Sequence, residues 1–161
     1  MAGGKGNKQK HDSPRINNRR ALHEYHIEAK LECGMVLVGT EVKSLRAGTA
    51  QLQEAYATVE HGTLILHQAH IDPYKQSAIV YNHVPTRDRV LLAHKREIRK
   101  LEDALKQRGT TLIPLAIYFK DGRAKVELGV ARGKQQFDKR ATIKKREMEK
   151  DVRRAMSQHR K

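Results

Sequence analysis

Apolar and polar residues alternate along positions 22–33, which is typical of a strand with one buried face. The apolar parity consists of Tyr25, Ile27, Ala29, Leu31 and Cys33. After Gly34, the run MVLV at 35–38 has no polar interruption, so it predicts a short buried segment. Cys33 is therefore expected to face the core.

A short helix is predicted over 41–46, because Gly39 and Thr40 end the alternating pattern. Thr40 is a suitable N-cap, and Gly48 is placed to end the helix. Val42 and Leu45 lie three residues apart and give this helix one small inner face.

Two hairpins follow from paired runs of alternating residues. The first joins 50–59 to 63–71 through His61-Gly62. The second joins 112–120 to 123–131 through Asp121-Gly122, a strong short-range hairpin signal. Pro114 in the second hairpin should lie at an edge or a bulge, because proline cannot donate to a ladder.

The segment between the hairpins contains a long loop over 72–89, a brief strand over 90–93 and a helix over 94–107. Several short antiparallel strands with two intervening helices favour a small barrel over a sandwich. We therefore expect a mainly β fold with helices, an OB-like antiparallel β-barrel with short flanking helices and a basic C-terminal tail.

Charge is concentrated at the two ends of the chain. Of the formal net charge of +15, residues 1–20 carry +5 and residues 134–161 carry +7, which leaves +3 for the middle. This division predicts a disordered basic segment over 1–17, a folded unit over 18–133 and a basic tail over 134–161. The tail has too few apolar residues to pack on a core, so we expect it to be disordered when free and helical when bound.

Such cationic segments require an anionic partner, and a polyphosphate backbone is the natural one. A membrane surface is the competing anion, but the apolar stripe of Met148, Val152 and Met156 is narrow and lacks Trp and Leu. A single cysteine, the lack of an apolar leader and the lack of an 18-residue apolar run favour a reducing cytoplasm and no membrane partner.

Motifs for catalysis and cofactor binding are weak. Gly34 and Gly39 stand five apart, but three residues separate Gly39 from Lys43, so a phosphate-binding P-loop is disfavoured. Histidine pairs three residues apart lie on opposite faces of a strand and cannot chelate a metal there. Neither Ser44 nor Cys33 has the setting of a nucleophile. We expect no catalytic residue, no metal and no cofactor.

Glu32 and Glu41 are carboxylates in a chain that should bind an anion. Each could accept a hydrogen bond from an RNA base or 2′-hydroxyl, or orient a neighbouring cation. Composition alone favours simpler roles, a surface strand acid for Glu32 and a helix-start acid for Glu41, where the helix dipole stabilises it.

The chain resembles the small protein B family of SsrA-binding proteins from about Asn17 to its C-terminus. The segments that carry the resemblance are NRRALHEYHIEAKLECG (18–34), GTEVKSLRAGTAQL (39–52), AHIDPY (69–74), LLAHKREIRKL (91–101), TLIPLAIYFKDGRAKVELGVARGK (111–134) and FDKR (137–140). They are unusual and occur in the family's order.

The resemblance implies a non-catalytic protein that binds the tRNA-like domain of transfer-messenger RNA (tmRNA, also called SsrA RNA). It further implies delivery of that RNA to stalled ribosomes for trans-translation, with elongation factor Tu involved indirectly through the charged RNA. Protein and RNA together would imitate a tRNA. A general ribosome-associated RNA-binding protein or RNA chaperone is the alternative. A monomer is expected.

Residue roles follow from the resemblance alone. It assigns RNA binding to ten positions: Asn18, Arg19, Arg20, Glu32, Glu41, Lys43, Arg46, Leu92, Lys125 and Lys134. It assigns contact with small-subunit RNA, at the decoding site and the mRNA channel, to the tail positions Gly133, Phe137, Asp138, Lys139, Arg140, Lys144, Lys145 and Arg146. Phe137 replaces another ring residue of many relatives, which preserves a stacking role and excludes a proton-dependent one.

Overall fold

The computed structural model describes residues 13–158 of the 161-residue chain. Most of the predicted N-terminal segment therefore lies outside the described residues. Its last two residues, Ile16–Asn17, form strand β1, which pairs with the second hairpin through Ile16 and Ile117.

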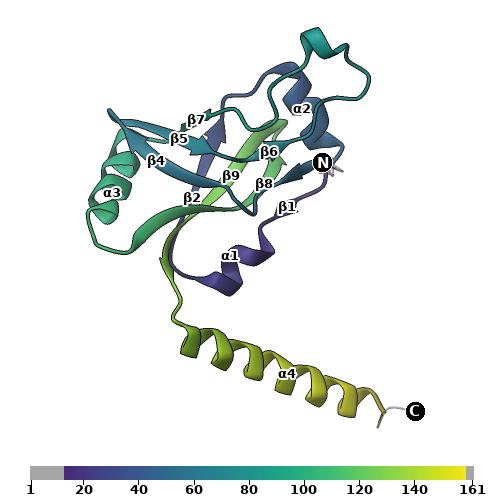
Figure 1. Cartoon of the computed structure of the whole chain (residues 1–161), viewed down its shortest axis with the longest axis vertical. Coiled ribbons are helices and arrows are strands. Elements are labelled where there is room, and N and C mark those ends of the chain that lie inside the picture. Colours follow the sequence, from purple (N-terminus) through teal and green to yellow (C-terminus); the bar gives the residue numbers. More distant parts are fainter. Residues whose placement is uncertain (1–12, 159–161) are drawn as a thin grey trace, which may run out of the picture.

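Six antiparallel strands close into a ring at the centre of the molecule (Figure 1). The order β8-β4-β5-β7-β2-β9 returns to β8 through the β8–β9 pairing, and β1 adds to the outside of β8. The bounds are β2 Tyr25–Met35, β4 Tyr56–Glu60, β5 Thr63–His67, β7 Arg89–Leu92, β8 Thr110–Lys120 and β9 Arg123–Gly133. A separate short pair joins β3 (Ala50–Gln51) to β6 (His70–Ile71).

Both predicted hairpins are confirmed. His61 and Gly62 have φ of 49° and 74°, and Asp121 and Gly122 have φ of 52° and 73°. Two successive positive φ values are what a two-residue turn of this twist requires, and Gly takes the second position at no steric cost. The first hairpin is shorter than predicted, because the chain leaves the ladder at both ends to form β3 and β6.

Pro114 lies at a break in the β8–β9 register, between Pro114 and Ala116, as predicted for a residue without an N–H. Leu115 has no partner in the β8–β9 register, and its carbonyl accepts a hydrogen bond from the Asn18 backbone N–H at 2.8 Å.

The helices are α1 Arg19–Glu24, α2 Gly39–Arg46, α3 Lys95–Leu105 and α4 Gln136–Gln158, with a 3-10 turn η1 at Ile79–Tyr81. The class is therefore mixed rather than mainly β. The predicted strand over 22–33 is wrong at its start, because the Asn18 side chain accepts a hydrogen bond from Ala21 N–H and caps α1.

Helix α2 begins two residues earlier than predicted, and Thr40 is not its N-cap. The Glu41 carboxylate instead accepts a hydrogen bond from Val38 N–H at 2.9 Å and satisfies an unpaired donor at the helix start. The buried run predicted over 35–38 is also wrong, since Val36 and Val38 are about half exposed while Met35 is buried.

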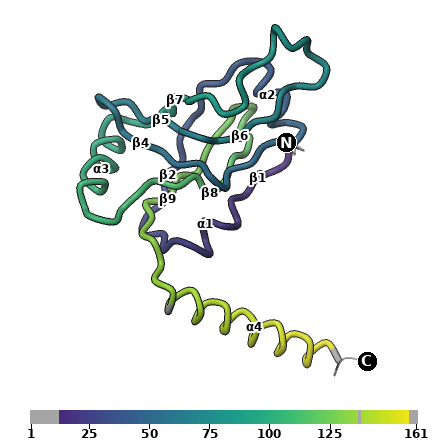
Figure 2. The backbone as a smooth tube through the Cα atoms, in the orientation of Figure 1, coloured from purple at the N-terminus to yellow at the C-terminus, as the bar shows by residue number. Residues whose placement is uncertain are grey.

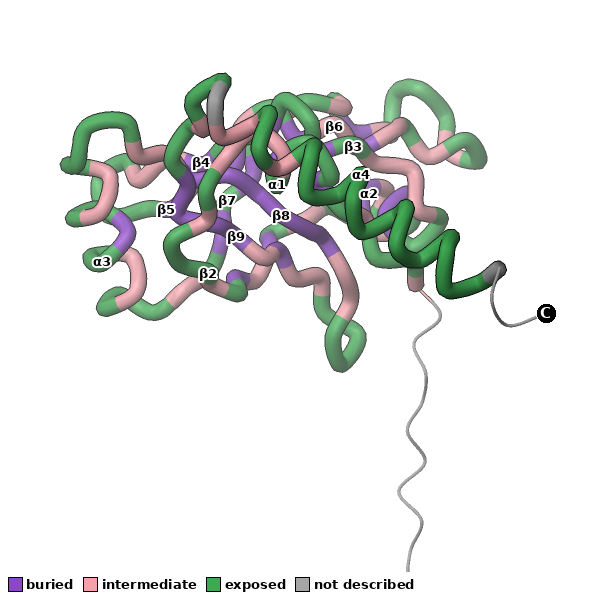
Figure 3. Tube along the Cα trace, turned by 90° about the horizontal axis from the view of Figure 1, so that it is seen from below, coloured by how far each residue is buried: buried purple, intermediate pink, exposed green. Residues whose placement is uncertain are grey.

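The core fills the ring with aliphatic side chains from β2, β5, β7, β8 and β9, and from α2 and α3. Figure 3 shows the buried positions along the backbone of the ring strands. Cys33 is fully buried there, as predicted. The backbone trace in Figure 2 shows that α4 leaves this body below α1 and extends away from it, while the 72–88 loop rises at the opposite end beside α2.

Candidate nucleic-acid interface

A hollow of about 330 Å³ opens on the outside of the ring, where β2, β7 and the β8–β9 turn meet α2. Leu92 and Lys125 both line it, and both pair with Gly34 in the strand register. A Cβ on Gly34 would lie 3.3 Å from the Leu92 Cβ, so only glycine lets Leu92 lie across β2 without displacement. Leu92 is 57% exposed, so its side chain is open to a partner at the edge of this hollow.

Two cations of α2 lie against aromatic rings, and one of these rings lines this hollow. The Arg46 guanidinium lies 5.1 Å from the centroid of Phe119, which lines the hollow, and the Lys43 Nζ lies 5.1 Å from the centroid of Tyr74. Both cations are exposed. An apolar hollow with cations fixed against aromatic rings nearby suits a nucleotide, which combines an aromatic base with a phosphate.

Glu32 is exposed on β2 and accepts hydrogen bonds from the Tyr118 hydroxyl and from Lys120 Nζ. These donors, with the positive charge of Lys125, hold the pKa of Glu32 below its usual value. Burial and the same carboxylate raise the pKa of Tyr118 to about 12. Glu32 is therefore a charged surface acid that orients a phenol and a lysine beside Lys125.

Glu41 is buried with no exposed surface, although the resemblance places it at the RNA. Its two oxygens bind Arg87 and Arg89, which are 2.6 Å and 2.9 Å away. In this structure Glu41 has no surface for RNA to contact, and its pairing with Arg87 and Arg89 agrees with the alternative in which the acid orients neighbouring cations. Glu41 does lie in the first turn of α2, as the helix-start interpretation predicted. That interpretation did not foresee its buried pairing with Arg89.

Four further predicted residues, Asn18, Arg19, Arg20 and Lys134, lie on or beside α1, which lies just below the ring in Figure 1, whereas α2 lies at its upper right. Asn18 is 3% exposed and donates to the carbonyls of Leu52 and Pro114, so it joins α1 to the segment after β3 and to strand β8. Arg19 is exposed. Lys134 Nζ donates to the Leu22 carbonyl, which fixes the start of the tail against α1.

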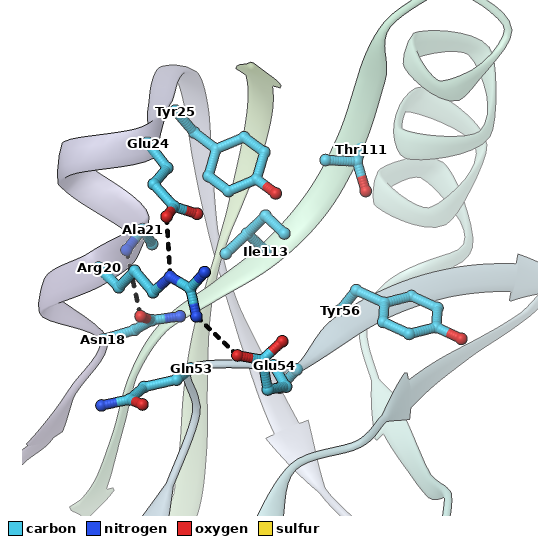
Figure 4. Close-up of a pocket in the computed structure, with 11 residues that line it drawn as sticks. Asn18, Arg20, Ala21, Glu24, Tyr25, Gln53, Glu54, Tyr56, Thr111 and Ile113 are labelled. Atoms are coloured by element: carbon cyan, nitrogen blue, oxygen red, sulfur yellow. Dashed lines mark hydrogen bonds and ion pairs between the residues drawn. The ribbon is translucent and has the colours of Figure 1, made fainter. Parts of the chain in front are cut away.

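Arg20 lies in a second hollow of about 310 Å³ and pairs with Glu24 and Glu54 at 2.8 and 2.6 Å (Figure 4). Tyr25 and Tyr56 also line this hollow. The two carboxylates outnumber the guanidinium, so this hollow is less suited to an anion than the one beside α2.

The tail forms one helix that makes little contact with the body (Figure 3). Gly133 ends β9, and Asp138 lies 3.6 Å from His26. The exposed tail cations include Arg140, Lys144, Lys145 and Arg146, whereas Lys139 is half-buried. Phe137 lies in the helix, but its side chain is outside the described part of the structure.

Sequence reasoning missed Phe119, Arg87 and Arg89. Phe119 lies two residues before the Asp121-Gly122 turn, and an aromatic side chain at the end of a predicted hairpin could have indicated a binding residue. Arg87 and Arg89 lie within the loop predicted over 72–89, and nothing in the neighbouring sequence indicates that Arg89 is buried.

Within residues 13–158, no helix is long and apolar enough to cross a membrane. The described residues also hold no group of three or more His, Cys, Asp or Glu side chains arranged to bind a metal ion.

The chain is similar to proteins of known family. The family model described as "SmpB protein" matches residues 15–158. The SsrA-binding protein of Chloroflexus aurantiacus is 48% identical over 153 residues, covering 95% of this chain and 96% of the relative. That of Geotalea uraniireducens is 52% identical over 136 residues, covering 84% and 89%.

A solved structure extends the similarity to three dimensions. A chain from "tmRNA-SmpB: a journey to the center of the bacterial ribosome" aligns with a TM-score of 0.66 and 48% identity, covering 76% of this chain and 86% of that chain.

Proposed function

Because this chain belongs to the SmpB protein family, we propose that it binds the tRNA-like domain of SsrA RNA and delivers it to stalled ribosomes for trans-translation. It does so without catalysis. The resemblance found in the sequence motifs is confirmed by the family match over residues 15–158.

The ring acts as an OB-type barrel, a fold whose outer surface binds nucleic acids in many proteins. The observation that carries the proposal is the hollow beside α2, where exposed Leu92, Lys125 and the Arg46–Phe119 pair converge. Lys125 and Arg46 bind phosphates, and Leu92 packs on a base or sugar. Glu32 orients its neighbours from the edge of this surface.

Helix α4 contacts the vacant decoding site and mRNA channel of the small ribosomal subunit. Its 23 residues extend about 35 Å and carry eight Lys or Arg against four acids. An mRNA in the channel would exclude such a helix sterically. The tail therefore binds only where the channel holds no mRNA. Elongation factor Tu joins only through the charged RNA, and the whole process takes place in the cytoplasm.

Competition binding tests the proposal directly. Labelled SsrA RNA is bound to the full chain at physiological salt and competed with bulk tRNA. We expect at least about tenfold preference, or ~1.4 kcal/mol, for SsrA RNA. Equal affinity for the two RNAs would favour a general RNA chaperone instead.

A chain ending at Lys134 separates the two roles, because it keeps all ten positions assigned to RNA binding and removes helix α4. We expect it to retain SsrA RNA affinity and to lose tagging of stalled polypeptides in a reconstituted translation system. Loss of SsrA RNA affinity in the truncated chain would contradict this division between barrel and tail.

A further inference from the structure

The loop over residues 72–88 exposes an apolar cluster at its tip. Ile79, Val80 and Tyr81 are 94%, 87% and 80% exposed, and Val84 is 64% exposed. The loop protrudes beyond α2 at the end of the molecule opposite α4 (Figures 1 and 2). A cluster of exposed apolar side chains of this kind marks an interaction site, because apolar surface is unfavourable in water and is stabilised when a partner covers it.

Specific hydrogen bonds hold the loop in one shape. Asn82 accepts from Tyr74 N–H at 3.0 Å and donates to the Tyr74 carbonyl at 2.9 Å, which closes the loop across its middle. His83 bonds the Thr40 hydroxyl at 2.8 Å and the Ile71 carbonyl at 2.9 Å, so the loop base is tied to α2. The tip is therefore preorganised, which lowers the entropic cost of binding.

The loop and α2 enclose a hollow of about 540 Å³ lined by Lys43, Tyr81, His83 and Arg87. Residues 73–87 contain two cations and no acid, but Arg87 is already paired with Glu41, so Lys43 is the lining cation left to face a ligand. The acids at the loop base are engaged, with Asp72 on His70 and Asp88 on His67. A ligand with a flat apolar part and a negative charge fits these surroundings, and a nucleotide has both.

This hollow continues the candidate interface. Leu37 and Val42 line the hollow that holds Leu92 and Lys125, and their neighbours Val38 and Lys43 line the hollow that holds Tyr81. Helix α2 therefore separates two adjacent nucleotide-sized hollows. An RNA that contacts Leu92 and Lys125 is therefore separated from the hollow beside the loop only by α2.

We propose that the 79–84 tip is a second contact with the same RNA, in which Tyr81 stacks on an unpaired base and Lys43 binds the adjoining phosphate. Ile79 and Val80 cover the edge of that base. This inference rests on the proposed function and extends its interface beyond the ten positions that the resemblance assigns.

The test compares Tyr81→Ala with Tyr81→Phe in the full chain, with SsrA RNA as the probe. Stacking requires the ring and not the hydroxyl. Tyr81→Ala should weaken binding about fivefold or more, and Tyr81→Phe should bind within about twofold of wild type. Because a base contact releases no counterion, Tyr81→Ala should keep the wild-type salt slope, whereas Lys43→Ala should lower that slope by about one.

The outcomes separate this inference from the proposed function. If the wild type prefers SsrA RNA and Tyr81→Ala binds equally well, the loop contact is wrong and the proposed function stands. If the wild type shows no preference, both fail. A photoreactive benzoylphenylalanine at position 79 should cross-link to SsrA RNA on the ribosome, and a cross-link only to a protein or a second copy of this chain would overturn the loop contact.

Discussion

Arg89 and Glu41 form an ion pair from which solvent is excluded: Arg89 Nε lies 2.9 Å from Glu41 Oε1, and neither side chain is exposed. Arg89 also donates to the carbonyls of Ala69 and Pro85, at 2.6 and 2.9 Å. One guanidinium thus joins α2 to both sides of the 72–88 loop. The pair supports the interface without lying in it.

Replacing Glu41 by Gln should strongly destabilise the fold. The substitution leaves the Arg89 charge buried and uncompensated, which costs about 3–5 kcal/mol in comparable pairs. Urea unfolding at neutral pH measures the loss. Glu32→Gln is the matched control, because Glu32 is exposed and should change stability by less than about 1 kcal/mol. Equal losses in the two variants would contradict a special role for the buried pair.

The same ion pair predicts that the free energy of unfolding depends on pH. Burial by itself raises the pKa of Glu41, but hydrogen bonds from Arg87 and Val38 N–H and the charge of Arg89 bring the pKa below its usual value. A carboxyl with a depressed folded-state pKa adds stability above its unfolded pKa, about 4.3, and this stability is lost as pH falls through the folded value. The gap in unfolding free energy between wild type and Glu41→Gln should therefore narrow below about pH 4.5. A constant gap would show that Glu41 does not titrate in this range.

Features set by neighbouring residues were predictable from sequence, and features set by distant contacts were not. The Asp121-Gly122 turn and the Pro114 bulge depend on backbone preferences of the residues themselves. The start of α1 depends on Asn18, whose amide is held by carbonyls 34 and 96 residues away. Alternation over 22–24 could not reveal this, since a six-residue helix has too little periodicity to compete.

The candidate site divides in the same way. Leu92 and Lys125 meet through Gly34 only after β2, β7 and β9 have paired. Arg46 has a clear cationic signal in sequence, but its partner Phe119 is 73 residues away. The sequence shows which residue types are present, but it does not show that they meet, because they come together only when the ring of strands closes.

Adding a methyl group at Gly34 should weaken RNA binding through Leu92. The new Cβ would lie 3.3 Å from the Leu92 Cβ, so Leu92 must move by a few tenths of an ångström. We expect Gly34→Ala to reduce SsrA RNA affinity several-fold and also to lower stability, because the Leu92 Cβ moves only together with the β7 backbone that pairs with Gly34. A double-mutant cycle tests the route: with Leu92→Ala already present, Gly34→Ala should add almost nothing. If the losses of RNA affinity from the two substitutions added, Gly34→Ala would not act through Leu92.

The thiol of Cys33 should be unreactive in the folded protein. The side chain is fully buried, and burial raises its pKa to about 12. Since only the thiolate attacks alkylating reagents, iodoacetamide at pH 8 should label the native chain only as fast as the chain unfolds. Labelling should be rapid in concentrated guanidinium chloride. Rapid labelling of the native chain would mean that the β2 region of the core opens locally.

Reversing the charges of Lys139 and Arg140 to Glu should weaken ribosome binding and spare SsrA RNA binding. Each lost phosphate contact should lower the salt slope of ribosome affinity by about 0.7–0.9. The matched control reverses Arg99 and Lys100, an adjacent exposed pair on α3. Binding to ribosomes stalled on truncated mRNA, measured across salt concentrations, should show the reduced slope for the tail variant alone. An unchanged slope would mean that neither tail cation touches a phosphate, and an equal effect of the α3 variant would reduce the tail's role to general positive charge.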